Sequence, residues 1–474
     1  MNFVSLEFSV FLLVFLLVQI PLRGRPAIYR PFLVLANLVF YAHSGLFFVP
    51  LLALVSLLVW LAALAMERYA QRRSFFLASA VLICLALLAF FKYGELIFLS
   101  ADQFLSRFGL QLPVLHEWGF PAGISFYTFQ AIAFLVEQYK KSKTAGRHTP
   151  PYLYVLCYLS FFPTVMAGPI FRPGQFFPQI EHGRTRFRLH RGFLLILSGL
   201  FKKVVIASYL SEYAVREVFQ TPELFSSFAV LGSVYAYAVQ IYCDFSGYTD
   251  LALGIGCLMG FELPRNFDSP YLSASIRDFW KKWHISLSSW LRDYLYIPLG
   301  GSRKGNRYVN LFITMVLGGL WHGAHPRYLV WGALHGGALA LNHLWAALKI
   351  KFGFTGVRNK NSAFLLKIVS IFVVFNFVCF AWIFFRAEDM RASFAVIERI
   401  AAFNTNGALL PLLAWPAMLA GFLLQAAGPP AYRWAMRAGR RIPWPLFAVL
   451  CALIAGLILR MGPEGVMPFI YFSY

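Results

Sequence analysis

Apolar runs follow one another along almost the whole chain, and most of them are long enough to cross a membrane. A transmembrane helix needs about 20 mostly apolar residues. The runs, by residue number, are 5–20, 31–48, 49–65, 75–98, 120–138, 151–168, 192–210, 226–243, 309–320, 327–346, 363–385, 408–425 and 444–461. We therefore expect an all-α polytopic membrane protein that folds as one bundle, with about 11–13 membrane segments.

The amino-acid composition excludes a soluble globular protein. Of the 474 residues, 59% are hydrophobic and 13% are charged, whereas ordinary domains are about 25% charged. The first apolar run has no basic flank and no small-residue cleavage pattern, so we expect a membrane helix and not a removable signal peptide. The six cysteines form neither a CxxC pair nor a dense disulfide framework, and we expect them to act as small packing residues.

Basic residues gather in the loops that follow the early apolar runs. The 42 Lys and Arg against 20 Asp and Glu give a formal charge of +22, which in a soluble protein would suggest nucleic-acid binding. Here they lie in the loops 21–30, 66–74 and 139–150, where cytoplasmic anchoring charges belong. This placement predicts an extracytoplasmic N-terminus and membrane lipids as partners, with no nucleic acid.

The alternation of inside and outside loops breaks after residue 150. The connection 172–191 is also basic, although the single run 151–168 separates it from the loop 139–150. Either the segment 151–168 is re-entrant or the rule of alternating loop charges fails here. Because irregular backbone at membrane depth must be covered by protein or water, this break indicates an internal cavity.

The segment 247–308 is too charged to lie in lipid and too aromatic for a solvated loop. We interpret 273–294 as one helix with an apolar stripe. The stripe consists of Ile276, Trp280, Trp283, Leu287, Trp290 and Tyr294. A neighbouring stripe consists of Arg277, Lys281, His284 and Ser288. We expect the first stripe to pack on the bundle and the second to present cations, an imidazole and a hydroxyl to a polar space.

His322 is the sharpest candidate for chemistry, because ionisable groups inside a membrane are functional candidates by default. It follows a long apolar run and has Gly318, Gly319 and Gly323 beside it, so backbone or substrate can approach closely. An imidazole suits acid–base work near neutral pH, and burial can keep it available as a base. The alternative is a structural imidazole that is hydrogen-bonded inside the bundle.

Two other chemistries are disfavoured. The four histidines His322, His325, His335 and His343 raise a zinc hypothesis, but no carboxylate or cysteine lies near them, and catalytic zinc normally needs three protein ligands. We therefore expect no metal. The chain has no Walker-type loop and no GxSxG motif, so a serine nucleophile of its own is not expected.

Two aspartates, Asp244 and Asp250, lie in the run Tyr242–Gly256 next to apolar sequence. Either carboxylate could orient an imidazole or pair with a cation. The alternative is a helix cap followed by an anchored turn.

Four motifs occur together in this chain: LRDYLYIPLGGSRKG, FWKKWHISLSSWLRDY, GLWHGA and YCDFSGYTDLALG. Their combination closely resembles the membrane-bound O-acyltransferase (MBOAT) family, and within it the bacterial branch that O-acetylates extracytoplasmic polysaccharides such as peptidoglycan and alginate. The resemblance runs from Phe120 to Phe385 and includes the C-terminal tail.

The resemblance implies an MBOAT-type helical bundle around a central tunnel, with some segments re-entrant. It also implies a multi-pass location in the inner (cytoplasmic) membrane of a bacterial cell. We expect one domain over 1–474, composed of N-terminal helices at 1–119, a catalytic core at 120–385, and C-terminal helices and a tail at 386–474.

By the same resemblance, His322 matches the family's invariant histidine and His284 the second, upstream one. His322 would act as the general base for an acceptor hydroxyl, which attacks the carbonyl of an acyl thioester. His284, Ser288 or a backbone N–H would steady the developing oxyanion. The donor would be acetyl-CoA or another acyl thioester, with no bound cofactor.

Several further residues are candidates for supporting the reaction or binding the donor. They are Asp244, Lys281, Lys282, Ser288, Trp321, Arg292, Arg303 and Lys304. The cations among them suit the phosphates of the donor. Anchoring to lipid headgroups is the alternative for these cations.

The sequence ends in PFIYFSY, which resembles the C-terminal Phe-x-Tyr motif of this branch. Tyr471 fits the tyrosine for which an acyl relay is implied, and the alternative is an aromatic anchor at the membrane surface. The chain departs from the family after WHGA, where it has His325, Pro326 and Arg327, and this puts a detailed carry-over to that loop in doubt.

The leading hypothesis is an acetyltransferase that moves acetyl across the membrane for O-acetylation of a cell-envelope polysaccharide, peptidoglycan before alginate or another exopolysaccharide. Transfer would be finished by an extracytoplasmic SGNH/esterase-like O-acetyltransferase subunit, because the chain has no segment large enough to form a glycan-binding domain outside the membrane. A transporter or flippase of a lipid-linked sugar is the alternative of another class. A noncatalytic scaffold is the third.

Overall fold

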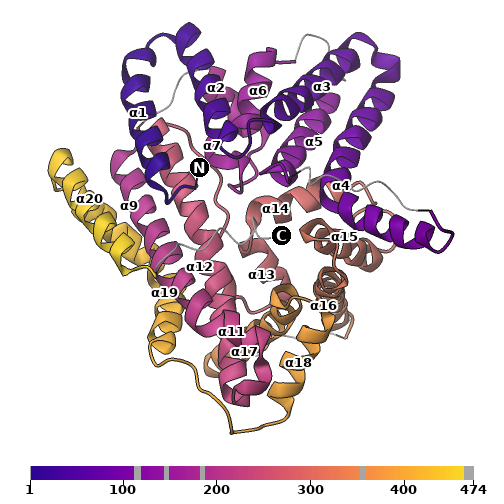
Figure 1. The fold of residues 1–474 in the computed structure, drawn as a ribbon, viewed down its shortest axis with the longest axis vertical. Helices are drawn as coiled ribbons and strands as arrows, with labels where there is room; N and C mark the ends of the chain where they lie inside the picture. Colours follow the sequence, from indigo (N-terminus) through magenta and orange to yellow (C-terminus); the bar gives the residue numbers. More distant parts are fainter. Residues whose placement is uncertain (1, 111–118, 143–148, 182–186, 353–358, 464–474) are drawn as a thin grey trace. The chain divides into compact units, whose positions relative to one another are not determined.

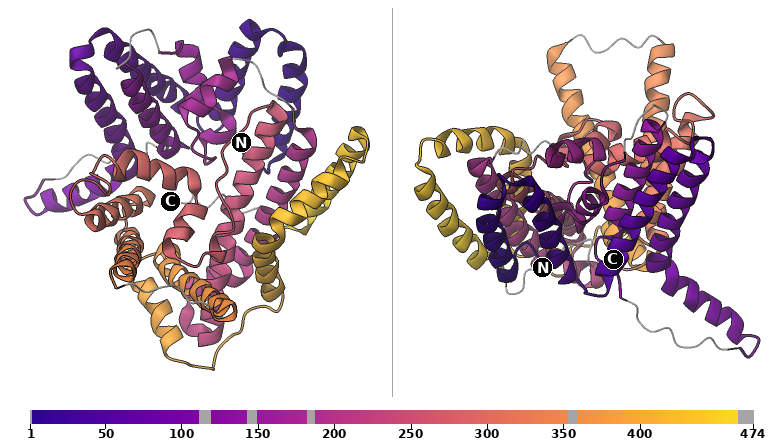
Figure 2. Two further views of the ribbon diagram at one scale, coloured as in Figure 1. Left: turned by 180° about the vertical axis from the view of Figure 1, so that it is seen from behind. Right: turned by 90° about the horizontal axis from the view of Figure 1, so that it is seen from above.

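The computed structural model describes residues 2–110, 119–142, 149–181, 187–352 and 359–463. Every regular element in these residues is a helix, as Figures 1 and 2 show. This confirms the all-α prediction. The chain forms two compact units, Met1–Phe187 with Leu258–Leu263 and Arg188–Cys257 with Pro264–Tyr474. The division into one domain with three parts remains a prediction.

The first unit contains the N-terminal helices. They are α1 (Leu6–Leu22), α2 (Pro26–Ala42), α3 (Phe48–Arg68), α4 (Arg73–Ser106), α5 (Ile124–Lys141), α6 (Tyr152–Ser160), α7 (Phe162–Val165) and α8 (Pro173–Glu181). α3 packs against α4, α5 and α6, and α2 packs against α6. Most side chains of α5 are buried, and only Lys140 and Lys141 at its end are exposed.

The apolar run 151–168 is broken at Phe161 into α6 and α7. The Asn37 side chain on α2 caps α7 at this break, because its Oδ1 accepts a hydrogen bond from the backbone N–H of Phe162 at 3.1 Å. Its Nδ2 donates to the carbonyl of Cys157 at 3.4 Å. Neither piece has the roughly 20 residues needed to cross a membrane. Whether this segment is re-entrant remains a prediction.

The second unit contains the remaining helices. They are α9 (Leu189–Leu200), α10 (Ser208–Leu210), α11 (Arg216–Gln220), α12 (Ser227–Met259, of which the last two residues belong to the first unit), α13 (Ile276–Lys282), α14 (Ile285–Leu291), α15 (Arg307–His322), α16 (Pro326–Lys351), α17 (Lys360–Arg386), α18 (Met390–Ala401), α19 (Ala414–Gly439) and α20 (Trp444–Met461). α9 continues through π-helical turns and α10 into α11, so that 189–220 is one long helix.

α9 and α12 approach each other closely because glycines lie between them. A Cβ on Gly199 would lie 2.7 Å from the backbone O of Gly247, and one on Gly254 would lie 2.8 Å from that of Gly192. Larger side chains at these positions would push the two helices apart. Because of this close approach, Lys202 and Lys203, which follow α9 in the same long helix, contact α12.

Six helical segments of the described chain are long and apolar enough to cross a membrane: Phe48–Arg68, Ala70–Ser106, Leu189–Gln220, Ser227–Met259, Lys360–Arg386 and Trp444–Met461. Shorter apolar helices lie at Leu6–Leu22, Pro26–Ala42 and Ala414–Ala426. The protein is therefore a multi-pass membrane protein, as predicted. The count of about 11–13 membrane segments and the central tunnel remain predictions.

Candidate active site

His322 is the last residue of α15, directly before the turn that leads into α16. The two helices touch through glycines, and a Cβ on Gly319 would clash with the backbone oxygen of Tyr328. The imidazole of His322 is only 7% exposed. Gly319 and Gly323 beside His322 thus lie against Tyr328 of α16, whereas Gly318 faces Leu291 of α14.

Aromatic rings surround the imidazole of His322. The ring of Phe385 on α17 lies 5.0 Å away and that of Trp331 on α16 lies 5.1 Å away, both edge to face. The neighbouring Trp321, a predicted supporting residue, lies at 4.8 Å. Such contacts hold the plane of the imidazole without using its nitrogen atoms.

His284 lies at a break in the predicted helix 273–294, so the single-helix prediction is wrong. α13 ends at Lys282 and α14 begins at Ile285, and His284 between them has φ 43°, in the left-handed region. The predicted apolar stripe is nevertheless the buried face, with Ile276, Trp283 and Leu287 among its buried members.

Asn266 causes this break from outside the helix. Its backbone carbonyl accepts from Ile285 N–H at 2.9 Å, and its Oδ1 accepts from Ser286 N–H at 3.1 Å. These are the first two N–H groups of α14, which have no partner within the helix. A side chain far from α14 in sequence therefore caps it, because His284 at the N-cap position does not.

The same amide oxygen fixes the tautomer of His284. The Nδ1 atom of His284 lies 3.2 Å from Asn266 Oδ1. The assignment of oxygen at that position follows from the N–H of Ser286, which can only donate. Nδ1 must therefore carry the proton, and Nε2 carries the lone pair. Burial lowers the pKa of His284 to about 3, so the ring is neutral near pH 7.

The hydroxyl of Ser288 is also engaged nearby, since it donates to the carbonyl of Trp283 at 3.0 Å. The two side chains predicted as oxyanion donors, His284 and Ser288, thus both donate hydrogen bonds within the protein. In this arrangement the Nε2 atom of His284 is an acceptor.

A continuous set of aromatic contacts connects the surroundings of the two histidines. Trp331, which touches His322, stacks on Trp382 at 5.9 Å, and Trp382 lies 5.2 Å from Trp283, the residue before His284. Both histidines are therefore set in or beside one aromatic core of the second unit.

His335 belongs to the same core and is fully buried. Its Nδ1 accepts a hydrogen bond from the indole N–H of Trp280 at 3.3 Å. Among the described residues, no three His, Cys, Asp or Glu side chains come together in a way that could hold a metal ion.

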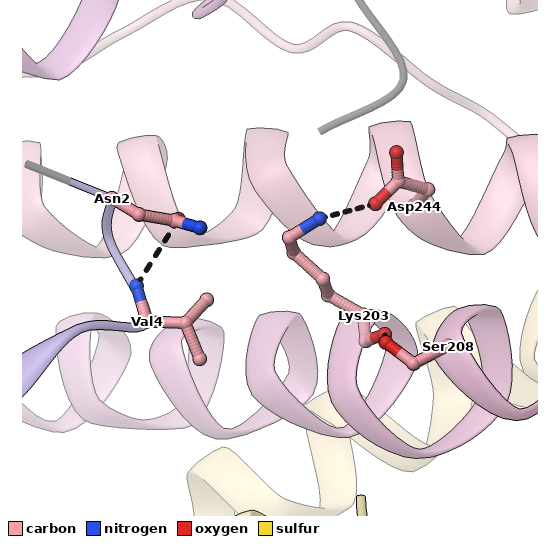
Figure 3. Close-up of polar contacts among 5 residues, drawn as sticks. All are labelled: Asn2, Val4, Lys203, Ser208 and Asp244. Carbon is pink, nitrogen blue, oxygen red and sulfur yellow. Dashed lines mark hydrogen bonds and ion pairs between the residues drawn. The ribbon is translucent and has the colours of Figure 1, made fainter. Parts of the chain in front are cut away.

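Asp244 and Asp250 pair with cations and do not cap a helix, because both lie inside α12. Lys203 Nζ lies 2.5 Å from Asp244 Oδ1, and Figure 3 shows its side chain extending toward that carboxylate. Lys202 Nζ lies 2.6 Å from Asp250 Oδ2, which also accepts from Ser198 at 2.8 Å. Of the alternatives for Asp244, ion pairing is the one the structure contains.

The predicted donor-binding cations are distributed between 281 and 304. Lys282 pairs with Asp278 at 2.8 Å and Arg292 with Asp293 at 2.7 Å. The three other cations of this set are exposed, namely Lys281, Arg303 and Lys304. Tyr471, the predicted acyl relay, lies outside the described residues.

Sequence analysis missed Lys202, Lys203 and Asn266. The two lysines carried a signal, because they are charges inside the apolar run 192–210, where ionisable residues need a partner. Asn266 lies outside every motif and stripe singled out above. Nothing in the local pattern connects it with α14.

Comparison with known proteins gives a consistent set of matches. The family model of the membrane-bound O-acyltransferase family matches residues 37–385. The probable alginate O-acetylase AlgI of Pseudomonas putida is 34% identical over 480 aligned residues, covering 94% of this chain and 95% of that protein. The peptidoglycan O-acetyltransferase of Helicobacter pylori is 34% identical, covering 80% of this chain and 75% of that protein. The teichoic acid D-alanyltransferase of Bacillus subtilis is 29% identical, covering 57% and 69%.

Proposed function

Because the chain belongs to the membrane-bound O-acyltransferase family and is therefore a membrane-bound acyltransferase, we propose that it serves the O-acetylation of a cell-envelope polysaccharide. The acetyl group comes from a cytoplasmic thioester, acetyl-CoA or another acyl thioester. Support comes from the relatives, whose names specify acetylation of alginate or of peptidoglycan. Peptidoglycan is the first polymer to test and alginate the second.

His322 is the general base of this proposal. Its imidazole takes the proton of an acceptor hydroxyl, the oxygen attacks the thioester carbonyl carbon, and the C–S bond breaks. The departing thiolate takes the proton back, so that an ester and a thiol are formed. The observation that carries the proposal is a buried imidazole at the junction of α15 and α16, in edge-to-face contact with the rings of Trp331 and Phe385.

His284 has a different task, which follows from its tautomer. The Nε2 lone pair accepts a hydrogen bond from the acceptor hydroxyl or from the returning thiol, and so orients that group. The oxyanion is then stabilised by backbone N–H groups, the remaining donor of the three predicted.

Other parts of the proposal rest on the family resemblance. The protein lies in the bacterial inner membrane, and Tyr471 accepts the acyl group as a relay. An extracytoplasmic SGNH/esterase-like subunit completes transfer to the polymer. The exposed cations Lys281, Arg303 and Lys304 attract the phosphates of the donor.

The test is polymer acetylation in cells that carry His322→Ala as their sole copy, with His325→Ala as the matched control. His325 lies three residues away, at the N-cap of α16. We expect ester-linked acetate on the purified polymer to be lost with His322→Ala and kept with His325→Ala. Undiminished acetate on both peptidoglycan and exopolysaccharide in the His322→Ala cells would contradict the proposal.

A further inference from the structure

A cavity of about 580 Å³ lies in the second unit, apart from the rings around His322. It is lined by α9, α12, the segment 265–269 and α19. None of the predicted catalytic or donor-binding residues lines it. Its volume lies in the range of small-molecule binding sites.

The walls of the cavity carry more positive than negative charge. Four cations line it, Arg191, Lys202, Arg265 and Arg433, against the carboxylates of Asp250 and Asp268. Lys202 and Asp250 neutralise each other. Arg265 and Arg433 are exposed and form no ion pair with any described residue. These two guanidinium groups are thus available to an anion.

Two residues of the cavity lining carry a buried polar group that lacks a hydrogen-bond partner within the described part of the chain. The two groups are Oγ1 of Thr249, a residue 2% exposed, and Nδ2 of Asn266, a residue 1% exposed. Both residues line the cavity. A buried donor without a partner is costly, and a bound group with acceptor oxygens would remove that cost.

Part of the lining is apolar, including Leu194, Leu195, Leu253 and Leu424. The occupant must therefore combine an anionic group rich in acceptor oxygens with an apolar body. Phosphate esters meet the first requirement, because guanidinium groups bind phosphate through paired hydrogen bonds.

We propose that this cavity binds a phosphate-bearing amphiphile, with its phosphate on Arg265, Arg433, Thr249 and Asn266. Two sources have this chemistry, an anionic phospholipid of the membrane and the coenzyme portion of an acyl thioester. Only the second source rests on the proposed function.

A ligand bound in the cavity acts on His284 through the side chain of Asn266. The oxygen of this amide accepts from Nδ1 of His284, and Asn266 is one of the residues that line the cavity. A phosphate bound to Nδ2 would fix the amide in the orientation that sets the tautomer of His284. The cavity is thus connected to the candidate active site by one side chain.

The test is binding of two ligand pairs to the purified full-length protein in detergent. The first pair is phosphatidylglycerol and diacylglycerol, and the second is coenzyme A and pantetheine, so each pair differs by its phosphate. The variant is Arg265→Gln/Arg433→Gln. The control is Arg437→Gln/Arg440→Gln, two exposed arginines at the end of α19 that do not line the cavity.

In at least one pair, we expect the wild type and the control to bind the phosphate-bearing ligand at least ~10-fold more tightly than its partner, and the cavity variant to lose that preference. The pair that responds identifies the source of the phosphate. Equal binding within both pairs, or a preference that survives in the cavity variant, overturns the proposal.

Two controls keep the result interpretable. Both substituted arginines are exposed, so the melting temperature without ligand should match that of the wild type. Binding is also measured on His322→Ala, where the phosphate preference should persist even though transfer is lost. The two proposals are therefore tested by different measurements: the proposed function by acetyl transfer, and the cavity proposal by the preference for the phosphate-bearing ligand.

Discussion

At the scale of single residues, two buried histidines are held by different forces. His284 is fixed by a hydrogen bond to the amide oxygen of Asn266, whereas the contacts around His322 are with aromatic rings. A hydrogen bond dictates which nitrogen carries the proton, and ring packing does not. His284 is thus suited to keeping its proton on Nδ1.

The neutral state of His284 predicts a pH dependence of stability. Its pKa is lowered from 6.5 to about 3, so below pH 6.5 the unfolded chain binds a proton that the folded protein does not. The stability contributed by this group is full above pH 6.5 and is lost as the pH falls toward 3, by at most ~1.4 kcal/mol per pH unit. The variant His284→Asn keeps a hydrogen-bond donor for Asn266. Between about pH 7 and pH 4, we expect its melting temperature to fall less than that of the wild type. Parallel melting curves would be inconsistent with a buried neutral imidazole.

The pair of Lys203 and Asp244 gives a second prediction at this scale. Lys203→Met removes the cation from a carboxylate that is almost completely buried, which should lower stability by about 3–5 kcal/mol. Adding Asp244→Leu should restore much of the loss, because no buried charge then lacks its counterion. Melting temperatures in detergent measure both effects. Lys282→Met, which breaks a partly exposed pair, is the control and should cost no more than ~1 kcal/mol.

At the scale of helices, the sequence predicted the positions of the elements better than their interruptions. Apolar runs gave most of the helices, and the stripe through Ile276, Trp283 and Leu287 gave the buried face of 273–294 correctly. The break at His284 was missed because its cap comes from Asn266, and such a cap leaves no mark on the local period.

At the break at Phe161, Asn37 of α2 likewise caps the following helix, and Pro163 at the start of that helix has no backbone N–H with which to continue α6. Here the charges of the flanking loops indicated an irregular segment, although they could not say which residue interrupts it. Local periodicity identifies helices. The residue at which a distant side chain caps a helix depends on tertiary contacts, which the local pattern does not contain. For the same reason, the candidate His322 could be found from the sequence, but its aromatic surroundings could not.

A glycine at a helix start gives the prediction at this scale. Gly123 precedes α5 with φ 74°, and a Cβ there would clash with the backbone oxygen of Val165. Gly123→Ala should therefore lower the melting temperature of the protein. Gly337→Ala within α16 is the control, because nothing lies within 4 Å of its Cβ, and it should stabilise by up to ~1 kcal/mol. Equal melting temperatures of the two variants would refute the strain at Gly123.

At the scale of the whole molecule, apolarity and charge define where the protein resides. The chain is 59% hydrophobic, and its described part contains six helices able to cross a membrane. Basic residues cluster in the loops that follow the early apolar runs, where cytoplasmic anchoring charges are expected, and anchoring to lipid headgroups remains a prediction. Membership of the acyltransferase family agrees with both properties.

The basic loops also predict an orientation. Because 21–30 and 66–74 carry clustered arginines, they should face the cytoplasm and the N-terminus should lie outside. A periplasmic reporter enzyme fused before Met1 should be active, and the same reporter placed in the loop 66–74 should not be. The reverse pattern of activity would contradict this orientation.

The central claim is that His322 removes the proton from the group that receives the acetyl. The direct measurement is acetyl transfer from a labelled acetyl thioester in isolated membranes that contain the wild type, His322→Ala or His325→Ala. Loss of a general base should slow transfer by ~10²–10⁴-fold in His322→Ala, while His325→Ala keeps the wild-type rate. Wild-type transfer by His322→Ala would remove the base on which the mechanism depends.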